Sequence, residues 1–122
     1  MNEKKKTLII GASPNPARYS YLALRRLRSY GHPVVAIGSK AVLVEDVPVT
    51  TAKESFSDID TITLYLNPTR QKEYYDYILS LNPKRIIFNP GTENAELEQL
   101  AQAKNIQVLE ACTLVMLGTG QY

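Results

Sequence analysis

The segment best suited to bind an anion follows the first apolar run of the sequence. It reads Gly11-Ala12-Ser13-Pro14-Asn15-Pro16-Ala17-Arg18. Gly11 permits a tight turn, Ser13 offers a hydroxyl and a backbone N–H, and Pro16 fixes φ where a helix could begin. Because the free N–H groups of a helix N-terminus attract anions, Arg18 and Ser20 are expected beside a bound phosphate. The alternative interpretation is an ordinary strand-to-helix turn with a Ser or Asn cap.

The end of the second apolar run indicates which phosphate-bearing ligand would fit. Dinucleotide-binding folds that prefer NAD usually carry an acid about 20 residues past the first loop, where it holds the ribose hydroxyls. Here the corresponding residues are Gly38, Ser39 and Lys40, and no acid is among them. Lys40 favours an extra phosphate on the adenosine ribose, as in NADP or coenzyme A (CoA). An exposed loop lysine is the alternative interpretation.

These loops need a scaffold that brings the ends of several strands together. Strands are expected at residues 6–10, 33–37, 61–66, 84–88 and 106–109, and helices at 18–30, 69–81 and 93–104. Residues 42–44 and 47–49 suggest short extended pieces around a turn. The alternation of strands and helices predicts an α/β protein with a Rossmann-like three-layer α/β/α architecture and a doubly wound parallel sheet of about five strands. Numbered along the chain, these strands are expected in the order 3-2-1-4-5, with 2-1-3-4-5 as the alternative.

Ligands of such sheets bind outside the carboxyl ends of the strands. Besides the two loops above, the strand ends carry Leu66-Asn67-Pro68, Asn89-Pro90-Gly91-Thr92-Glu93 and Glu110-Ala111-Cys112. Neither a P-loop nor a hydrolase G-x-S-x-G motif occurs in the sequence. The strand ends therefore favour a binding site over either of these catalytic centres.

Taken together, the strand-end segments resemble the small CoA-binding proteins, which are similar to the N-terminal domain of the succinyl-CoA synthetase α subunit. The resemblance covers nearly the whole chain and implies a single domain, residues 1–122, that binds CoA or acyl-CoA. It implies phosphates near Gly11, Ser13, Arg18 and Ser20, the ribose phosphate near Lys40, adenine and ribose beside residues 66–68, and pantetheine along residues 89–93. The full set of expected binding residues is Gly11, Ala12, Ser13, Pro16, Arg18, Ser20, Gly38, Ser39, Lys40, Leu66, Asn67, Pro68, Asn89, Pro90, Gly91, Thr92 and Glu93.

The resemblance leaves three hypotheses for the activity of the chain. Succinyl-CoA synthetases phosphorylate a histidine in a separate domain, and this chain has neither that domain nor a suitable histidine, so a stand-alone binder without ligase activity is expected. An NADP-linked or acyl-transfer enzyme would use Cys112 or Glu93, although a lone cysteine is usually a small core residue. A regulatory subunit would dock to a partner through the apolar residues 114–117, which otherwise close the core. His32 is expected on the surface, at the amino edge of the sheet.

Composition sets the outer limits of these hypotheses. The 122 residues are 44% hydrophobic, enough for one folded domain, and the net charge of +2 argues against a nucleic-acid coat protein. One cysteine and one histidine disfavour a disulfide framework or a metal centre. No apolar run is long enough for a signal peptide or a membrane span. A cytoplasmic protein with a small-molecule ligand is expected, as a possible homodimer or with an unknown protein partner.

Positive charge is concentrated in the first third of the sequence. Residues 1–44 contain eight Lys or Arg and a single acid, and no Asp or Glu lies between Gly11 and Glu45. This distribution favours an anionic ligand near the first loop, or alternatively a solvated basic face of the helix at 18–30.

Overall fold

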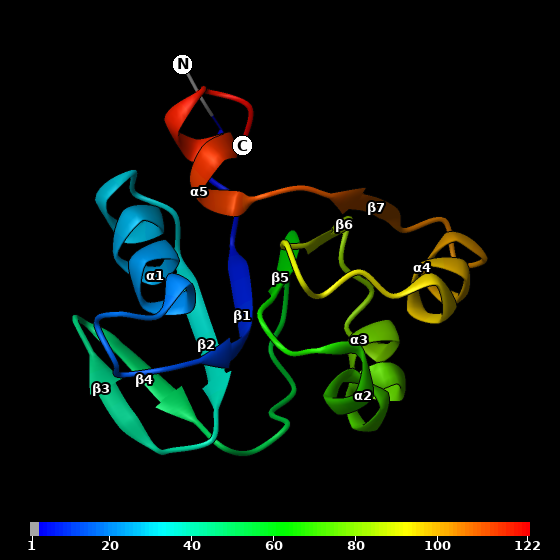
Figure 1. Ribbon diagram of the computed structural model, residues 1–122, viewed down its shortest axis with the longest axis horizontal. Coiled ribbons are helices and arrows are strands. Elements are labelled where there is room, and N and C mark those ends of the chain that lie inside the picture. Colours follow the sequence, from blue (N-terminus) through cyan, green and yellow to red (C-terminus); the bar gives the residue numbers. More distant parts are fainter. Residues whose placement is uncertain (1–2) are drawn as a thin grey trace.

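A seven-stranded sheet forms the centre of the computed structural model, which describes residues 3–122 (Figure 1). The strands are β1 (Thr7–Ala12), β2 (Val34–Gly38), β3 (Val42–Val44), β4 (Val47–Thr50), β5 (Thr61–Leu64), β6 (Arg85–Phe88) and β7 (Gln107–Glu110). Their spatial order is β3-β4-β2-β1-β5-β6-β7, and only the β3–β4 pair is antiparallel. The predicted α/β class with a mostly parallel sheet is therefore confirmed.

The predicted strand order is wrong for the five strands expected from the sequence. Those strands are β1, β2, β5, β6 and β7, and they lie in the alternative order 2-1-3-4-5. The difference arises from β4, which pairs in parallel with β2 through Ala36–Val49 and Ile37–Thr50. With β4 included, the six parallel strands lie in the order β4-β2-β1-β5-β6-β7. Numbered along the chain, this order is 3-2-1-4-5-6, so the direction of winding reverses between β1 and β5. The two short extended pieces expected at 42–44 and 47–49 are the strands β3 and β4. They form an antiparallel hairpin with the expected turn between them.

Helices cover both faces of this sheet. They are α1 (Tyr19–Ser29), α2 (Pro68–Gln71), the 3₁₀ turn η1 (Lys72–Tyr74), α3 (Tyr75–Ser80), α4 (Ala95–Gln102) and α5 (Thr113–Gly118). Helices α1 and α5 contribute to the hydrophobic core on one face, whereas α3 and α4 contribute to the core on the other (Figure 1). The expected helix at 69–81 is divided into α2, η1 and α3, and the apolar segment 114–117 is helical. Among residues 3–122, no helix has the length and apolar character needed to cross a membrane.

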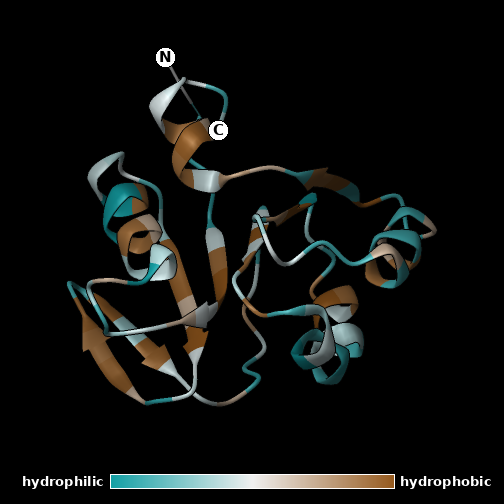
Figure 2. Ribbon diagram, in the orientation of Figure 1, coloured by the Kyte–Doolittle hydropathy of each residue, from teal (hydrophilic) through white to brown (hydrophobic). Residues whose placement is uncertain are grey.

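The strands are held by apolar side chains that alternate between the two cores. On β1, Leu8 and Ile10 face one core and Ile9 faces the other, and all three are fully buried. Each such side chain stabilises the fold by about 1.5–3 kcal/mol. Figure 2 shows the result, because the strands are mostly brown while hydrophilic residues concentrate in the loops and on the helices. The residues at the ends of β1, β2 and β5 are thereby fixed relative to one another.

The segment 114–117 closes the core more than it offers a docking surface. Met116 and Leu117 are buried, and Leu117 belongs to the same core as Leu24 and Leu27 of α1. Leu114 is half-buried, and Val115 has 58% of its surface exposed. The core-closing interpretation therefore holds for the two buried residues of the segment.

His32 is buried, so its expected position on the surface is wrong, although it does lie at the amino edge of the sheet. Only 4% of its surface is exposed, and its Nδ1 accepts a hydrogen bond of 2.9 Å from the backbone N–H of Lys5. The ring of Tyr122 lies 5.0 Å from the imidazole, between centroids. Residues from both ends of the chain cover His32, a long-range arrangement that local sequence does not encode.

Stability is expected to fall in mild acid because of His32. Burial lowers the pKa of His32, and the positive charges of Lys4, Lys5 and Arg85 lower it further. His32 therefore takes up a proton more readily in the unfolded chain than in the folded one. The free energy of unfolding is at its full value above about pH 6.5 and decreases as the pH falls toward and through the pKa of His32 in the folded state. Urea unfolding of wild type and His32→Asn between about pH 7 and pH 5 checks this.

The asparagine variant is the informative comparison because its Oδ1 can still accept the bond from Lys5. Its unfolding free energy is expected to change less with pH than that of the wild type. Parallel pH dependences for the two proteins would assign the acid sensitivity to other groups.

Candidate functional site

A cleft of about 360 Å³ opens where β1, β2 and β5 end. The expected binding residues that line it are Gly11, Ala12, Ser13, Arg18, Ser20, Gly38, Ser39, Leu66, Pro90 and Thr92. The expected residues outside the lining are Pro16, Lys40, Asn67, Pro68, Asn89, Gly91 and Glu93. Tyr19, Tyr65, Arg70 and Tyr74 also line the cleft and were not expected. The carboxyl edge of the sheet thus brings most of the predicted set together.

Two glycines allow the strand ends beneath the cleft to pack closely. Gly11 has a φ of 97°, and a Cβ there would lie 3.0 Å from the carbonyl carbon of Tyr65 at the end of β5. At Gly38, a Cβ would lie only 2.3 Å from the backbone oxygen of Ala12. Glycine at both positions therefore sets the spacing of the three strands that line the cleft.

The loop after β1 holds itself in place by short-range hydrogen bonds. The Oγ of Ser13 accepts from the N–H of Asn15 at 3.1 Å, and the Oδ1 of Asn15 accepts from the N–H of Ala17 at 2.9 Å. These side chains therefore bond within the loop and do not cap α1. Arg18 occupies the N-cap position without a capping side chain, and the first turn of α1 contains no acid. The interpretation as a helix start capped by Ser or Asn does not hold.

The start of α1 is consequently available to a ligand. Arg18, Tyr19 and Ser20 all line the cleft, so the first turn of the helix borders it. An uncapped helix N-terminus presents N–H groups and a partial positive charge, which attract anions. The structure brings the predicted phosphate neighbours Ser13, Arg18 and Ser20 together at the start of α1, and the binding of an anion there stays a prediction.

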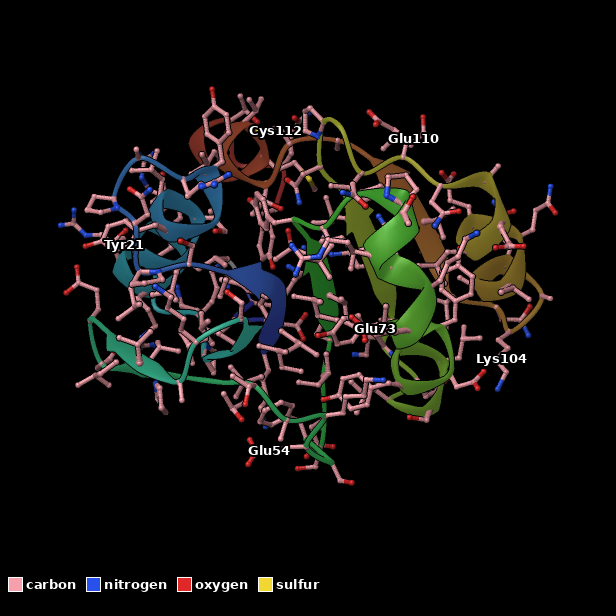
Figure 3. All side chains as sticks on the ribbon, turned by 60° about the horizontal axis from the view of Figure 1, so that its bottom comes forward. Tyr21, Glu54, Glu73, Lys104, Glu110 and Cys112 are labelled. Atoms are coloured by element: carbon pink, nitrogen blue, oxygen red, sulfur yellow. The ribbon has the colours of Figure 1, made fainter. Side chains whose placement is uncertain are left out.

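The opposite wall comes from the end of β5 and from α2. Asn67 lies outside the lining because it caps α2, where its Oδ1 accepts from the N–H of Arg70 at 2.9 Å. The buried Gln71 then fixes this helix, with its Nε2 donating to the carbonyls of Leu66 and Thr92 at 2.8 Å each. Arg70 and Tyr74 follow one turn apart and line the cleft. Figure 3 shows α1 on one side of β1 and the helices from α2 to α3 on the other.

Basic side chains dominate the electrostatics of the cleft. Arg18 and Arg70 line it, and no acidic residue does so within residues 3–122. Lys40 is exposed in the turn after β2 and lies outside the lining, as an ordinary loop lysine would. The side chain of Tyr65 completes the floor; burial raises the pKa of its phenol well above the ordinary value. The cleft is therefore suited to an anion and carries a neutral tyrosine.

The loop after β6 serves mainly to hold the fold together. Asn89 is buried, and its side chain bonds Thr63 and Leu64 of β5 and Thr113 of α5. Glu93 is exposed and its Oε1 accepts from the N–H of Gly91 at 2.9 Å. Pro90 and Thr92 are the members of the loop that reach the cleft.

The residues considered for an enzymatic role lie outside the cleft lining. Glu93 bonds within its own loop, and Cys112 is half-buried where α5 begins (Figure 3). Neither residue is part of the cleft wall. Within residues 3–122, no cluster of three or more His, Cys, Asp or Glu side chains could hold a metal ion.

Of the cleft residues that were not expected, Arg70 and Tyr74 carried a weak signal in the sequence. Arg70 stands three residues after Asn67, so a helix starting at Pro68 brings it to the edge of the sheet. Tyr74 falls four residues later, on the same side of a helix. The sequence alone showed the helical spacing and did not show that this side faces a cleft.

Solved structures share this architecture. One described only as an uncharacterized protein has 48% sequence identity over 99% of this chain and 100% of its own, with a TM-score of 0.96. A hypothetical protein from Pyrococcus horikoshii OT3 has 22% identity over 95% of this chain and 83% of its own, with a TM-score of 0.86. A Thermus thermophilus structure has 19% identity over 98% and 91%, with a TM-score of 0.82. The last two establish the fold alone. No curated protein matches the chain.

The match to a family model is more specific. The model of the CoA binding domain matches residues 5–118, nearly the whole chain. The match includes both cleft walls, from the loop after β1 to the loop after β6. This chain therefore belongs to the CoA binding domain family.

Proposed function

We propose that this protein binds CoA or acyl-CoA in the cleft at the carboxyl edge of the sheet, as a stand-alone binder without ligase activity of its own. The observation that carries the proposal is the cleft itself. An uncapped helix N-terminus and two arginines surround it, and no carboxylate lines it within the described residues. A diphosphate needs this combination of N–H donors and positive charge. Family membership supports CoA as the bearer of that diphosphate.

The geometry supports a particular placement of the ligand. The diphosphate lies by Ser13, Arg18 and Ser20, because the first turn of α1 borders the cleft there. The adenosine end extends toward Gly38 and Ser39 at the end of β2, and the pantetheine arm extends along Leu66, Pro90 and Thr92. The volume of about 360 Å³ falls within the usual range of small-molecule sites.

Thermal unfolding with matched concentrations of CoA, dephospho-CoA, NADP and NAD tests this function. At 100 times its dissociation constant, CoA is expected to raise the unfolding free energy by about 2.7 kcal/mol. For a domain of this size, the midpoint temperature would rise by several degrees. Dephospho-CoA, which lacks the ribose phosphate, is expected to give a smaller rise. NAD, which also lacks the pantetheine arm, is expected to give the smallest. A rise with NADP alone would replace the proposal with an NADP-dependent activity, and no rise with CoA would remove it.

A further inference from the structure

We infer that Arg70 contacts the diphosphate of the ligand from the wall opposite α1. This inference rests on the proposed function and names a further binding residue of that site. Arg18 follows β1 and Arg70 follows β5, the two neighbouring strands between which the winding of the sheet reverses. Nucleotide diphosphates bind at this reversal in doubly wound sheets. Arg70 is therefore aligned with the diphosphate rather than with the adenosine end.

The backbone of Arg70 is held firmly enough to position a guanidinium. Its N–H donates to Oδ1 of Asn67 at 2.9 Å, and Pro68 occupies the first turn of α2. The neighbouring Gln71 is fully buried and bonds the carbonyls of Leu66 and Thr92. Helix α2 is thus tied both to the end of β5 and to the loop after β6. A side chain projecting from it starts from a fixed point on the cleft wall.

The guanidinium of Arg70 is also uncommitted. Within residues 3–122 it forms neither an ion pair nor a hydrogen bond, and its side chain is exposed. Two of the three arginines of α1 that lie away from the cleft differ, because Arg25 pairs with Glu45 and Arg28 with Asp46, each at 2.6 Å, whereas Arg26 has no such partner within the described residues. The guanidinium of Arg70 is therefore free to bind an anion in the cleft.

Lysines near the same wall are less suited to this contact. The Nζ of Lys53 lies 5.1 Å from the centre of the Tyr74 ring and donates to the carbonyl of Glu73 at 2.5 Å. Lys72 follows Arg70 by two residues and lies outside the cleft lining. An arginine is the better receptor in any case, since its planar fork can donate two parallel hydrogen bonds to phosphate oxygens.

Calorimetric titration of wild type, Arg70→Gln and Lys72→Gln with CoA and with dephospho-CoA tests the inference. Both variants lose one positive charge from the same helical segment, so Lys72→Gln controls for the general electrostatic field. Arg70→Gln is expected to lower the affinity for both ligands about tenfold, because both carry the diphosphate. Lys72→Gln is expected to change either affinity less than about twofold. Arg70→Lys, which keeps the charge and loses the fork, is expected to fall between wild type and Arg70→Gln.

Three results would overturn the assignment. Equal affinities of wild type and Arg70→Gln would show that Arg70 does not contact the ligand. A loss confined to CoA would place Arg70 at the ribose phosphate instead. Equal losses in Arg70→Gln and Lys72→Gln would show a general field effect. Failure of the wild type to bind CoA would overturn the proposed function itself, and is distinguished from the other results by the first titration.

Discussion

Gly38→Ala is expected to lower the unfolding free energy by about 3 kcal/mol or more. The added Cβ would lie 2.3 Å from the backbone oxygen of Ala12 and 3.0 Å from Cγ1 of Val49. Real Cβ atoms do not approach a carbonyl oxygen so closely, so β2 would have to move away from β1. Ala12 is paired with Gly38 in the sheet and cannot yield as the end of a flexible side chain could. The strain therefore falls on the sheet itself.

Gly118→Ala is the matched control for this substitution. Gly118 ends α5, no atom lies within 4 Å of its added Cβ, and its φ is outside the strained positive range. Alanine there is expected to leave stability unchanged or to raise it by up to about 1 kcal/mol, because alanine favours the helix. Urea unfolding of both variants without ligand makes the comparison. Similar values for the two would show that the end of β2 can shift at little cost.

Part of the site could be predicted from the sequence because glycines such as Gly38 mark strand ends that pack closely together. An apolar run followed by glycine is typical of a strand that ends beside a ligand, and the parallel topology brings such ends to one edge. Gly11 and Gly38 line the cleft for this reason, as do Ser13, Arg18 and Ser20 of the first loop. The fold class followed from the same local signals.

The order of the strands could not be predicted as well because it depends on a weak element. The segment containing β4 reads Val47-Pro48-Val49 and is short, and proline rarely marks a central strand. Its pairing with β2 is long-range and follows from the packing of Val47 and Val49 in the core under α1. Omitting this strand changed the numbering of every later one.

Burial of polar residues was the other feature that the sequence did not disclose. A polar side chain at a strand end can face a ligand or face the interior, and its type is the same in both cases. His32 and Asn89 face the interior, where backbone and threonine partners satisfy them. Arg70 was missed for a similar reason. The sequence placed it on a helix but did not show whether its side chain faces the cleft or the solvent.

Asn89→Ala is expected to lower the unfolding free energy by about 3 kcal/mol. The Nδ2 of Asn89 donates to Thr63 Oγ1 at 2.7 Å and to the carbonyl of Leu64 at 2.9 Å, while its Oδ1 accepts from the N–H of Thr113 at 2.9 Å. These bonds join β5, β6 and the start of α5 in a buried site. Alanine removes them together and leaves the Thr113 N–H buried without that partner, which is more costly than losing an exposed bond.

Asn67→Ala provides the comparison, because both asparagines were expected among the ligand-binding residues, Asn67 beside adenine and ribose and Asn89 along pantetheine. Asn67 is exposed and its Oδ1 caps α2, so its loss is expected to cost about 1 kcal/mol. Urea unfolding without ligand, followed by CoA titration of the folded variants, separates stability from binding. A large loss of stability for Asn89→Ala alone would establish that this side chain supports the fold. If Asn89→Ala instead kept the unfolding free energy of the wild type and bound CoA more weakly, Asn89 would be a ligand-binding residue, because removing a side chain that supports the fold lowers stability.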